Sequence, residues 1–533
     1  MPLYAAVDIG SNSVRMMVAD VEANQKTQIL AEDRLVTRLG ESVFQRGRIS
    51  EDAIRFVCDN LARTAQTIRK FELRGLRAVA TSAVRDAGNQ ADFISRAEAA
   101  LGYAVEVISG AEESRLIHLG VQARWPQPDR RILIVDVGGG SSELIASDRG
   151  VLAESFSKPL GAVRLTTVFL QHDPPLSMEL HQMDEFIREK LAEPVGRLGG
   201  LRFDRTIGTS ATAAAIVTAV NKIPRARREE ADRLAATRAD IRKLYQELSG
   251  LDVAARRKVT GIGPRRADLI VPGIAVFLRV LEAFEQDSML YSVAGVRDGI
   301  IADLAARGAG NAVSRLTADQ QRVVEAMAAR YGVHVEHARK VAELSHELFL
   351  ALTPLHKLPP QQGRMLEAAA YLHDIGHFVS DTAHHKHSYY LVLNSDMPGF
   401  TDAERQFIAS LCRYHRKSAP ASRHPQFQAV HSGERQALIL LTPLLRLADS
   451  LDRGHGQRVE HVTVELRSGN VVLGLQAAGE VDLEVWAAER IASLFHETYG
   501  VPLVVNVART VPSAPLAPAS LTASGARTES PTE

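Results

Sequence analysis

One short pattern constrains this chain more than any other, because it occurs twice in the same local setting. Residues 8–13 read DIGSNS and residues 136–141 read DVGGGS, and each copy follows a run of apolar residues. Another apolar run, residues 14–21, follows the first copy and predicts a strand, a Gly-rich turn and a second strand. The repeat predicts two related halves, and halves that face one another would line a cleft with both turns.

The two turns have the composition of phosphate-binding loops. Glycines let backbone N–H groups approach phosphate oxygens closely, and small polar side chains add donors. A third loop, residues 208–212, precedes an apolar helix at 213–220 whose positive N-terminus could also face phosphate. Gly and Ser equally make ordinary turns, but two loops that each follow a buried strand and an Asp favour phosphate binding. The predicted phosphate-binding residues are Gly10, Ser11, Asn12, Ser13, Gly138, Gly139, Gly140, Ser141, Gly208 and Thr209.

Acidic side chains near the turns are better suited to a metal ion than to phosphate, because like charges repel. Asp8 and Asp136 open the two turns, and Glu143 follows the second turn by two residues. Magnesium typically binds one or two carboxylates together with substrate oxygens and waters. We therefore expect Asp8, Asp136 and Glu143 to hold Mg²⁺ in the cleft.

The pattern of apolar residues divides the 533-residue chain into parts, and its length predicts about three to four domains. Strands alternate with helices up to residue 307, which predicts an α/β fold. Residues 314–455 are almost wholly helical, and residues 459–510 predict a small α+β domain with strands around one helix at 482–499. The expected domains are 1–125, 126–307, 314–455 and 459–510, followed by a tail at 511–533 whose composition predicts disorder.

Charge and cysteine content restrict the partners and the compartment. Lys and Arg number 63, as do Asp and Glu, so no global positive field attracts nucleic acid. Only Cys58 and Cys412 occur, which suits a reducing compartment. Residues 1–6 lack the basic flank of an export signal, and no apolar run reaches the ~18 residues of a membrane helix. We expect a cytoplasmic protein with neither a specific nucleic-acid partner nor a membrane partner.

Seven motifs, in order along the chain, make a specific family resemblance. They are AAVDIGSNSVRMMVADV, ATSAVRDA, VISGAEESRLIHLGV, IVDVGGGSSELI, LGAVRLT, RRADLIVPG and GVRDGI. Over roughly residues 3–305 the chain resembles the exopolyphosphatase and guanosine pentaphosphate phosphatase family, within the sugar kinase/actin ATPase superfamily. The resemblance implies two RNase H-like α/β domains around a cleft, and a homodimer.

The motif GAEESRL, residues 110–116, contains two adjacent acids at the start of a helix. Neighbours on a helix point in different directions, so one of them can face the cleft. Acids in a first turn also suit the helix dipole, and it is the resemblance that makes Glu113 the general base and Glu112 the weaker candidate. Arg85 in ATSAVRDA is the best candidate to clamp the terminal phosphate, since a guanidinium donates two parallel hydrogen bonds. Weaker candidates for the same role are Arg15, Arg38, Arg115 and Arg164.

The helical region carries a second pattern. His337, the doublet His373-Asp374 and Asp449 follow the order H, HD, D and resemble the HD phosphohydrolase superfamily. Imidazoles and carboxylates on facing helices can close around a second divalent metal ion. Further histidines in segments that could approach this site are His384, His385, His387 and His415. A scaffold or regulatory role is favoured for this region over a second active centre, and both readings stay open.

Two closely related activities use the same predicted parts. The leading hypothesis is an exopolyphosphatase that removes terminal phosphates from inorganic polyphosphate by Mg²⁺-assisted water attack. The alternative is a guanosine pentaphosphate 5'-phosphohydrolase. A non-catalytic alarmone or nucleotide sensor, an HD phosphodiesterase and a sugar kinase are further alternatives. A long polyanion would use a basic groove, to which the contributors could be Arg339, Lys340, Lys386, Arg413, Arg416 and Lys417.

Overall fold

The structure is a computed structural model, and it describes residues 2–22, 27–308, 314–467 and 469–509. Its internal contacts divide the chain into two units. The first unit joins Met1–Ala326 with Tyr390–Gln406, and the second joins Met327–Tyr389 with the chain from Phe407 onward. The four domains expected from the sequence are a finer division and stay predictions. The tail expected at 511–533 lies outside the described residues.

The first unit opens with a five-stranded mixed sheet in the order β3-β2-β1-β4-β5. Its strands are β1 (Leu3–Ile9), β2 (Ser13–Val21), β3 (Thr27–Val36), β4 (Leu73–Ala80) and β5 (Val105–Val107). β1, β2 and β3 are antiparallel neighbours, whereas β4 runs parallel to β1 and β5 runs parallel to β4. The hairpin predicted around the first turn is confirmed, and its register pairs Asp8 with Arg15.

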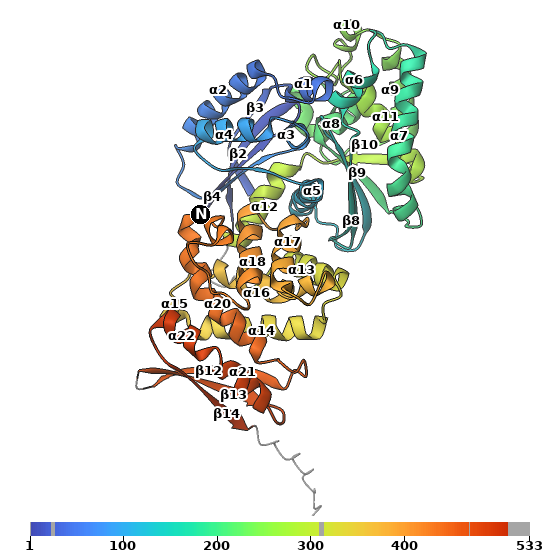
Figure 1. Ribbon diagram of the computed structural model, residues 1–533. Helices are drawn as coiled ribbons and strands as arrows, with labels where there is room; N and C mark the ends of the chain where they lie inside the picture. The colour runs from blue at the N-terminus through green and yellow to red at the C-terminus, as the bar shows by residue number, and fades with distance from the viewer. Residues whose placement is uncertain (1, 23–26, 309–313, 468, 510–533) are drawn as a thin grey trace, which may run out of the picture. The chain divides into compact units, whose positions relative to one another are not determined.

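Helices cover this sheet and close its core (Figure 1). They are α1 (Leu39–Arg46), α2 (Glu51–Ile68), α3 (Ser82–Arg85) and α4 (Gln90–Leu101). α2 begins where its sequence predicts, because the Ser50 hydroxyl accepts a hydrogen bond from the Ala53 N–H and caps the first turn. Ile54, Val57 and Leu61 repeat at helical spacing and are buried against the sheet.

The second half repeats the same strand order and adds one edge strand, β10. Its strands are β6 (Arg131–Val137), β7 (Ser142–Asp148), β8 (Val151–Lys158), β9 (Arg205–Thr209), β10 (Ala235–Thr237) and β11 (Ser288–Tyr291). Read from β8, the order β8-β7-β6-β9-β11 matches β3-β2-β1-β4-β5. The predicted pair of RNase H-like α/β halves is therefore confirmed.

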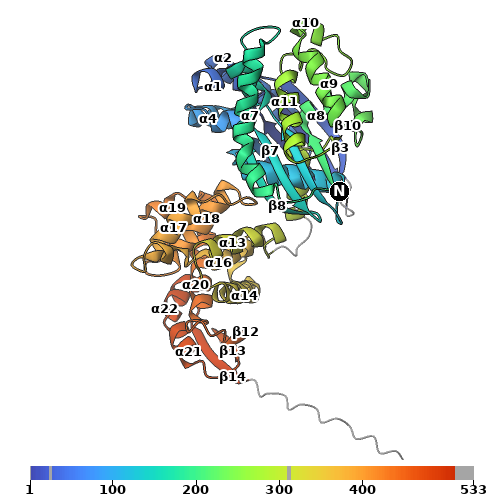
Figure 2. The same ribbon diagram turned by 90° about the vertical axis from the view of Figure 1, so that its right-hand side faces the viewer.

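Helices cover the second sheet as well, and α7 and α11 lie across one of its faces (Figure 2). The elements between the strands are α6 (Ala162–Phe169), α7 (Ser177–Leu198), α8 (Ser210–Val220), the 3-10 helix η1 (Arg225–Ala231), α9 (Arg238–Ser249), α10 (Val253–Arg256) and α11 (Ile270–Ala283). Met183 and Ile187 of α7 meet Ile274 of α11 and Leu133 of β6 in one core.

Two helices tie the halves together at their centre. α5 (Gly110–Arg124) and α12 (Val296–Gly308) lie side by side (Figure 1). Their contact is backbone to backbone, because a methyl group added at Gly299 would lie 1.8 Å from the Leu116 carbonyl oxygen. α12 lies against β1 and β4 of the first sheet, while α5 lies against β7 and β8 of the second. α5 is therefore held rigidly between the two sheets.

The second unit combines helices with a small sheet. The helical elements of this region, counting those that join the two units, are α13 (Ala318–Arg330), α14 (Val335–Ala351), α15 (Thr353–His356), α16 (Gln361–Leu372), η2 (Ile375–Phe378), α17 (His384–Asn394), α18 (Asp402–Tyr414), α19 (Pro425–Gln428), η3 (Ser432–Glu434) and α20 (Arg435–Ser450). α14 contacts both α16 and α20, so the predicted helical domain is confirmed as a fold.

The sheet that follows has the order β12-β13-β14, with β12 (Val459–Arg467), β13 (Asn470–Ala477) and β14 (Leu503–Arg509). The single helix predicted at 482–499 is wrong in detail. The structure has two helices there, α21 (Asp482–Glu489) and α22 (Ala492–Tyr499), with a turn at Arg490 and Ile491. Neither Gly nor Pro marks this break in the sequence, so no local signal predicted it. Among the described helices none is long and apolar enough to cross a membrane.

Candidate active site

The two repeated turns line one cavity of about 670 Å³ in the first unit. Both turns close in the same way, because the N–H of Gly10 donates to the Ser13 carbonyl and the N–H of Gly138 donates to the Ser141 carbonyl, each at 3.0 Å. The cavity lining contains Asp8, Gly10, Ser11, Asn12, Ser13, Asp136, Gly138, Gly139, Gly140 and Ser141. The structure thus brings together the two loops that the sequence predicted to share a cleft.

The glycines of the second loop are required by its contact with the first loop. A methyl group added at Gly140 would lie 2.5 Å from Ser82 Oγ and 2.7 Å from Ser11 Oγ. One added at Gly139 would lie 3.0 Å from the Ser11 Cβ. Ser11 is itself fixed, since its hydroxyl accepts a hydrogen bond of 3.1 Å from the Ala83 N–H at the start of α3. The two loops therefore form one interlocked surface.

In the third predicted loop, the residues that line the cavity come later in the sequence than expected. Gly208 and Thr209 end β9 and do not line the cavity, whereas the next residues, Ser210 and Ala211, do. A side chain at Gly208 would meet Met289 of the neighbouring strand. The Thr209 hydroxyl donates to Asp136 and so orients a carboxylate instead of meeting the cavity. α8 begins at Ser210, three residues before the predicted position.

Among the acidic residues that line this cavity are Asp8, Asp136 and Glu113, whereas Glu143 lies beside Glu113 and Asp136 without lining it. Asp136 and Glu143 are direct partners across β6 and β7, which places both side chains on one face of the sheet. Burial is the main cause that raises the pKa of Asp8, Asp136, Glu113 and Glu143. The pKa of Glu143 rises to about 7 through burial and the nearby Asp136 charge. The group is therefore crowded with negative charge that a cation would neutralise.

Glu113 enters the cavity from the first turn of α5 and is only 8% exposed. Burial and the Glu143 charge raise its pKa well above the ordinary range. Its Oε2 has no hydrogen-bond donor within the described part of the chain. Arg85 lies behind it, with Nη1 3.6 Å from this oxygen and donating to the Ile108 carbonyl at 2.6 Å. Arg85 thus contacts the candidate base and is absent from the cavity lining.

The cationic side of the cavity was largely missed by the sequence analysis. Of the predicted arginines only Arg15 lines it, and the others that do so are Arg34, Arg227, Arg228, Arg266 and Arg297. Burial and the neighbouring Arg15 lower the pKa of Arg34 to about 8. The same two causes lower the pKa of Arg266 to about 10. Arg34 and Arg266 are therefore crowded by other cations, and an anion in the cavity would relieve this repulsion.

A sequence signal existed for two of these arginines. Arg266 lies in the motif RRADLIVPG and Arg297 lies in GVRDGI. The remaining three arginines proposed as weaker phosphate contacts have other partners. Arg38 pairs with Glu41 and Asp268, Arg115 pairs with Glu112 and Asp303, and Arg164 donates to the Gly140 carbonyl and pairs with Asp86.

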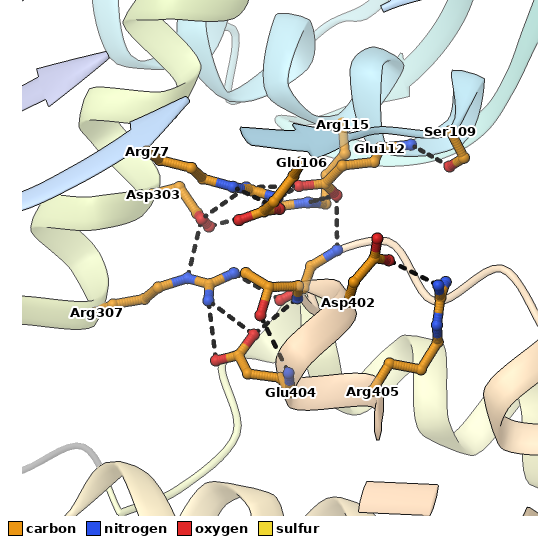
Figure 3. A network of polar contacts seen from close by, with 12 residues as sticks. Arg77, Glu106, Ser109, Glu112, Arg115, Asp303, Arg307, Asp402, Glu404 and Arg405 are labelled. Atoms are coloured by element: carbon orange, nitrogen blue, oxygen red, sulfur yellow. Dashed lines mark hydrogen bonds and ion pairs between the residues drawn. The ribbon is translucent and has the colours of Figure 1, made fainter. Parts of the chain in front are cut away.

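Glu112, the neighbour of Glu113, faces away from the cavity into a buried network of charges. Figure 3 shows Arg77 and Arg115 on either side of its carboxylate, with the Arg77 Nη1 and Arg115 Nε each 2.8 Å from a carboxylate oxygen. Asp303 of α12 joins the network through Arg115 Nη1 at 3.0 Å and Arg307 Nε at 2.9 Å. The network therefore clamps α5 to α12.

The same network holds part of a distant segment. The Gly399 N–H donates to Glu112 Oε2 at 2.7 Å, and Arg307 bonds both to the Gly399 carbonyl and to Glu404 (Figure 3). Ser109, which caps α5, donates to Asp396 at 2.7 Å. Tyr390–Gln406 is thereby fastened to the first turn of α5, the turn that carries Glu113.

Comparison with known protein families decides the family of this chain. The model of the Ppx/GppA phosphatase family matches residues 17–307, and the model of Ppx/GppA phosphatase domain III matches residues 320–482. The chain belongs to the Ppx/GppA phosphatase family. The resemblance found in the ordered motifs is thus confirmed. The second Gly-rich loop and Glu113 lie within the matched residues 17–307, and the first Gly-rich loop directly precedes them.

Relatives that are named for an activity are similar to this chain over most of its length. A protein of Vibrio vulnificus named guanosine-5'-triphosphate,3'-diphosphate pyrophosphatase is 27% identical over 510 residues, which is 95% of this chain and 98% of the relative. A Photobacterium profundum protein of the same name is 28% identical over 90% of this chain and 92% of its own length.

Solved structures of the family match the α/β part. The Aquifex aeolicus family member is 29% identical with a TM-score of 0.51, covering 58% of this chain and 99% of that one. A structure described as an exopolyphosphatase from Cytophaga hutchinsonii is 25% identical with a TM-score of 0.54, covering 57% of this chain and 98% of its own.

The domain III region of this Ppx/GppA member brings together all four residues of the H, HD, D pattern. The Asp449 Oδ1 lies 3.6 Å from His337 Nε2 and 3.5 Å from His373 Nε2. Asp374 Oδ2 lies 3.5 Å from His373 Nε2. Within the described residues neither buried Nε2 has a hydrogen-bond partner. Imidazole nitrogens and carboxylate oxygens so arranged fit a divalent metal ion.

Proposed function

We propose that the cavity of the α/β halves hydrolyses the terminal phosphoanhydride of guanosine 5'-triphosphate 3'-diphosphate. The observation that carries the proposal is the state of Glu113. It is a buried carboxylate with a raised pKa and, among the described residues, an oxygen that lacks a hydrogen-bond donor, and it faces a cavity lined by two predicted phosphate loops and six arginines. A carboxylate of this kind is suited to remove a proton from a water molecule near neutral pH.

The reaction follows from these positions. A water oxygen bonds to the terminal phosphorus, and the bond from that phosphorus to the bridging oxygen breaks. Glu113 takes a proton from the water, and the products are inorganic phosphate and guanosine 5'-diphosphate 3'-diphosphate. The loop N–H groups and the arginines stabilise the negative charge that spreads over the phosphoryl oxygens.

Asp8, Asp136 and Glu143 would hold Mg²⁺ in this proposal. Hard carboxylate oxygens are the ligands that Mg²⁺ prefers, and burial together with mutual repulsion makes a cation favourable here. When bound, the ion neutralises charge on the substrate phosphates. Thr209 orients Asp136 by donating a hydrogen bond to it, and Ser157 donates to Glu143 at 2.8 Å.

The choice of substrate rests on the relatives. Curated relatives that align over 90% or more of the chain carry the name of the guanosine pentaphosphate activity. The sequence analysis favoured polyphosphate, and these relatives support its alternative better. Inorganic polyphosphate remains the second candidate substrate, because the Cytophaga hutchinsonii structure is described as an exopolyphosphatase. A cavity lined by arginines and backbone donors also suits any chain of phosphates.

The test is phosphate release by the purified protein with Mg²⁺, from guanosine pentaphosphate and from long-chain polyphosphate. Glu113→Gln keeps the size of the side chain and removes the base, so we expect a loss of ~100-fold or more. Glu72→Gln, a change at an exposed glutamate, is the matched control. Faster release from polyphosphate would reverse the order of the two substrates. Binding without any phosphate release would indicate a sensor instead of an enzyme.

A further inference from the structure

Glu112, the buried neighbour of Glu113, is held from three directions at once. Arg77 of β4 donates from Nη1 to Glu112 Oε1 at 2.8 Å, and Arg115 of α5 donates from Nε to Oε2 at 2.8 Å. The third donor is the Gly399 N–H, which lies 2.7 Å from Oε2 (Figure 3). Hydrogen bonds to a charged carboxylate are the stronger kind. Because Glu112 and Glu113 share a planar peptide bond, fixing the first side chain restrains the backbone that carries the second.

The loop between α17 and α18, residues 395–401, supplies this third donor and makes a second contact with the same turn. The Ser109 hydroxyl accepts from the Glu112 N–H at 3.2 Å and donates to Asp396 Oδ1 at 2.7 Å. The Ser109 carbonyl also accepts from the Glu113 N–H at 3.0 Å. A hydroxyl has one proton and two lone pairs, so Asp396 takes the proton and leaves the lone pairs to cap the helix.

Gly399 is itself held in one orientation within the first unit. Its carbonyl accepts from Arg307 Nη2 at 2.6 Å and from Gln320 Nε2 at 2.9 Å. Its φ of +92° lies in the left-handed region that favours glycine, and an added methyl group would lie 3.3 Å from the Gln320 Cγ. The loop therefore presents a fixed N–H to α5.

Glu113 has few restraints on its own carboxylate. Within the described residues its Oε2 has no hydrogen-bond donor, and the nearest guanidinium nitrogen, Arg85 Nη1, lies 3.6 Å away. Arg85 donates instead to the carbonyl of Ile108, the residue before the cap. The backbone of the first turn of α5 therefore sets where the Glu113 carboxylate points. A displacement of about 1 Å in a reacting group can cost on the order of 100-fold in rate.

We propose that Asp396 and Gly399 are positioning residues for hydrolysis, because they hold the first turn of α5 so that Glu113 is directed at the attacking water. The inference rests on the proposed function, in which Glu113 is the base. Among the described residues that line the cavity, none belongs to 395–401. The loop therefore acts through α5 and not on the substrate, so losing its contacts lowers kcat and leaves KM nearly unchanged.

The first test is steady-state phosphate release from guanosine pentaphosphate with Mg²⁺, on full-length Asp396→Ala and Asp396→Asn proteins. Alanine lacks the acceptor, whereas asparagine keeps an oxygen to which the Ser109 hydroxyl can donate. We expect Asp396→Ala to lower kcat ~10-fold or more with KM within about twofold of wild type. Asp396→Asn should retain most of the wild-type kcat. A wild-type kcat in Asp396→Ala, or an equal loss in both variants, overturns the role of this hydrogen bond.

Two further variants complete this test. Asp129→Ala changes an exposed aspartate in the loop that follows α5, and as the control it should match wild type. Gly399→Ala strains the backbone and turns the N–H away from Glu112, so we expect a larger loss of kcat than in Asp396→Ala. A melt on each sample shows that it is folded. A folded Gly399→Ala protein with wild-type kcat overturns the role of Gly399.

The second test separates positioning of the base from general support of the fold. Asp396→Ala is repeated in a Glu113→Gln background, where a residue that acts through Glu113 has no further effect on kcat. The same fold-loss in both backgrounds overturns the inference, because Asp396 would then act on something other than the base. A wild-type rate in Glu113→Gln alone would instead refute the proposed function, so the two failures are distinguishable.

Discussion

Glu112 and Glu113 are neighbours in the first turn of α5, and their surroundings are opposite. Both are buried. Burial alone would raise the pKa of Glu112, but Arg115 and Arg77 more than offset it and hold the pKa below its ordinary value. The pKa of Glu113 is raised by burial and by the Glu143 charge.

The comparison extends to the two regions that the helix separates. In the network around Glu112, each guanidinium meets carboxylates directly, so charge is compensated within the protein. At the cavity, carboxylates gather around Glu113 and Glu143 while the arginines around Arg34 and Arg266 crowd one another. A compensated cluster stabilises the fold, whereas an uncompensated one favours binding of a cation and an anion from outside.

Breaking the charge network around Glu112 should have the largest effect on the free energy of unfolding. Glu112→Gln removes the charge that Arg77 and Arg115 share, and leaving buried guanidiniums short of a partner costs about 3–5 kcal/mol. We expect the free energy of unfolding to fall by this amount in urea titration. Glu72→Gln is the control, and an equal stability of the two variants would contradict a structural role for the network.

The uncompensated side should respond in the opposite way. Glu113→Gln removes a charge that burial disfavours, so we expect stability to hold or rise while kcat falls ~100-fold, about 2.7 kcal/mol in the barrier. Steady-state phosphate release and a thermal melt on the same sample check both halves. A variant that loses stability and keeps its rate would reverse the assignment of the two glutamates.

The pH dependence of stability sharpens the contrast. The folded pKa of Glu143 is raised to about 7, so the stability it contributes is present at low pH and is lost as pH rises through 7. Without Mg²⁺ we expect the protein to lose about 2 kcal/mol between pH 5 and pH 8. Mg²⁺ should flatten this slope because the ion replaces the proton, and Glu143→Gln should flatten it without Mg²⁺. A slope unchanged by either treatment would argue against a cation site.

The smallest effect concerns the contact between the loops. Gly140→Ala forces a methyl group against Ser82 and Ser11, and we expect a cost of about 1–2 kcal/mol in stability together with slower phosphate release. Gly200→Ala is the matched control, since nothing lies within 4 Å of the added methyl group. Equal melting temperatures for the two variants would show that the first loop moves aside freely.

Local sequence signals predicted the elements that depend on a few adjacent residues. Ser50 followed by Glu51 and Asp52 is such a signal, and Ser50 caps α2 because a cap is made within one turn of the chain. The repeat at residues 8–13 and 136–141 predicted both turns and the pairing of two similar halves. Where the local signal was weak, the prediction failed, as at the break between α21 and α22.

The candidate site was predicted in part for the same reason. Its carboxylates and glycines come from motifs, but Arg34 and Arg228 come from β3 and η1, which carry no motif. Arg85 was expected to meet phosphate and instead contacts Glu113 and a backbone carbonyl. In the helical domain, the Nε2 atoms of His384 and His415 lie 3.1 Å apart although the residues are 31 positions apart in the sequence, and no spacing rule joined them.

By itself the sequence determined the family, the repeated α/β halves, the Asp and Gly residues of both loops and the order of the H, HD, D residues. Each of those features depends on a short stretch of sequence, because neighbouring residues are enough to form it. Tertiary structure alone decided which buried charges are paired, because the partners of Glu112 lie as far away as Gly399. A carboxylate stabilises the fold when cationic groups lie near it in space, and it is available for a ligand when they do not. The residues beside it in the sequence do not determine which of the two holds.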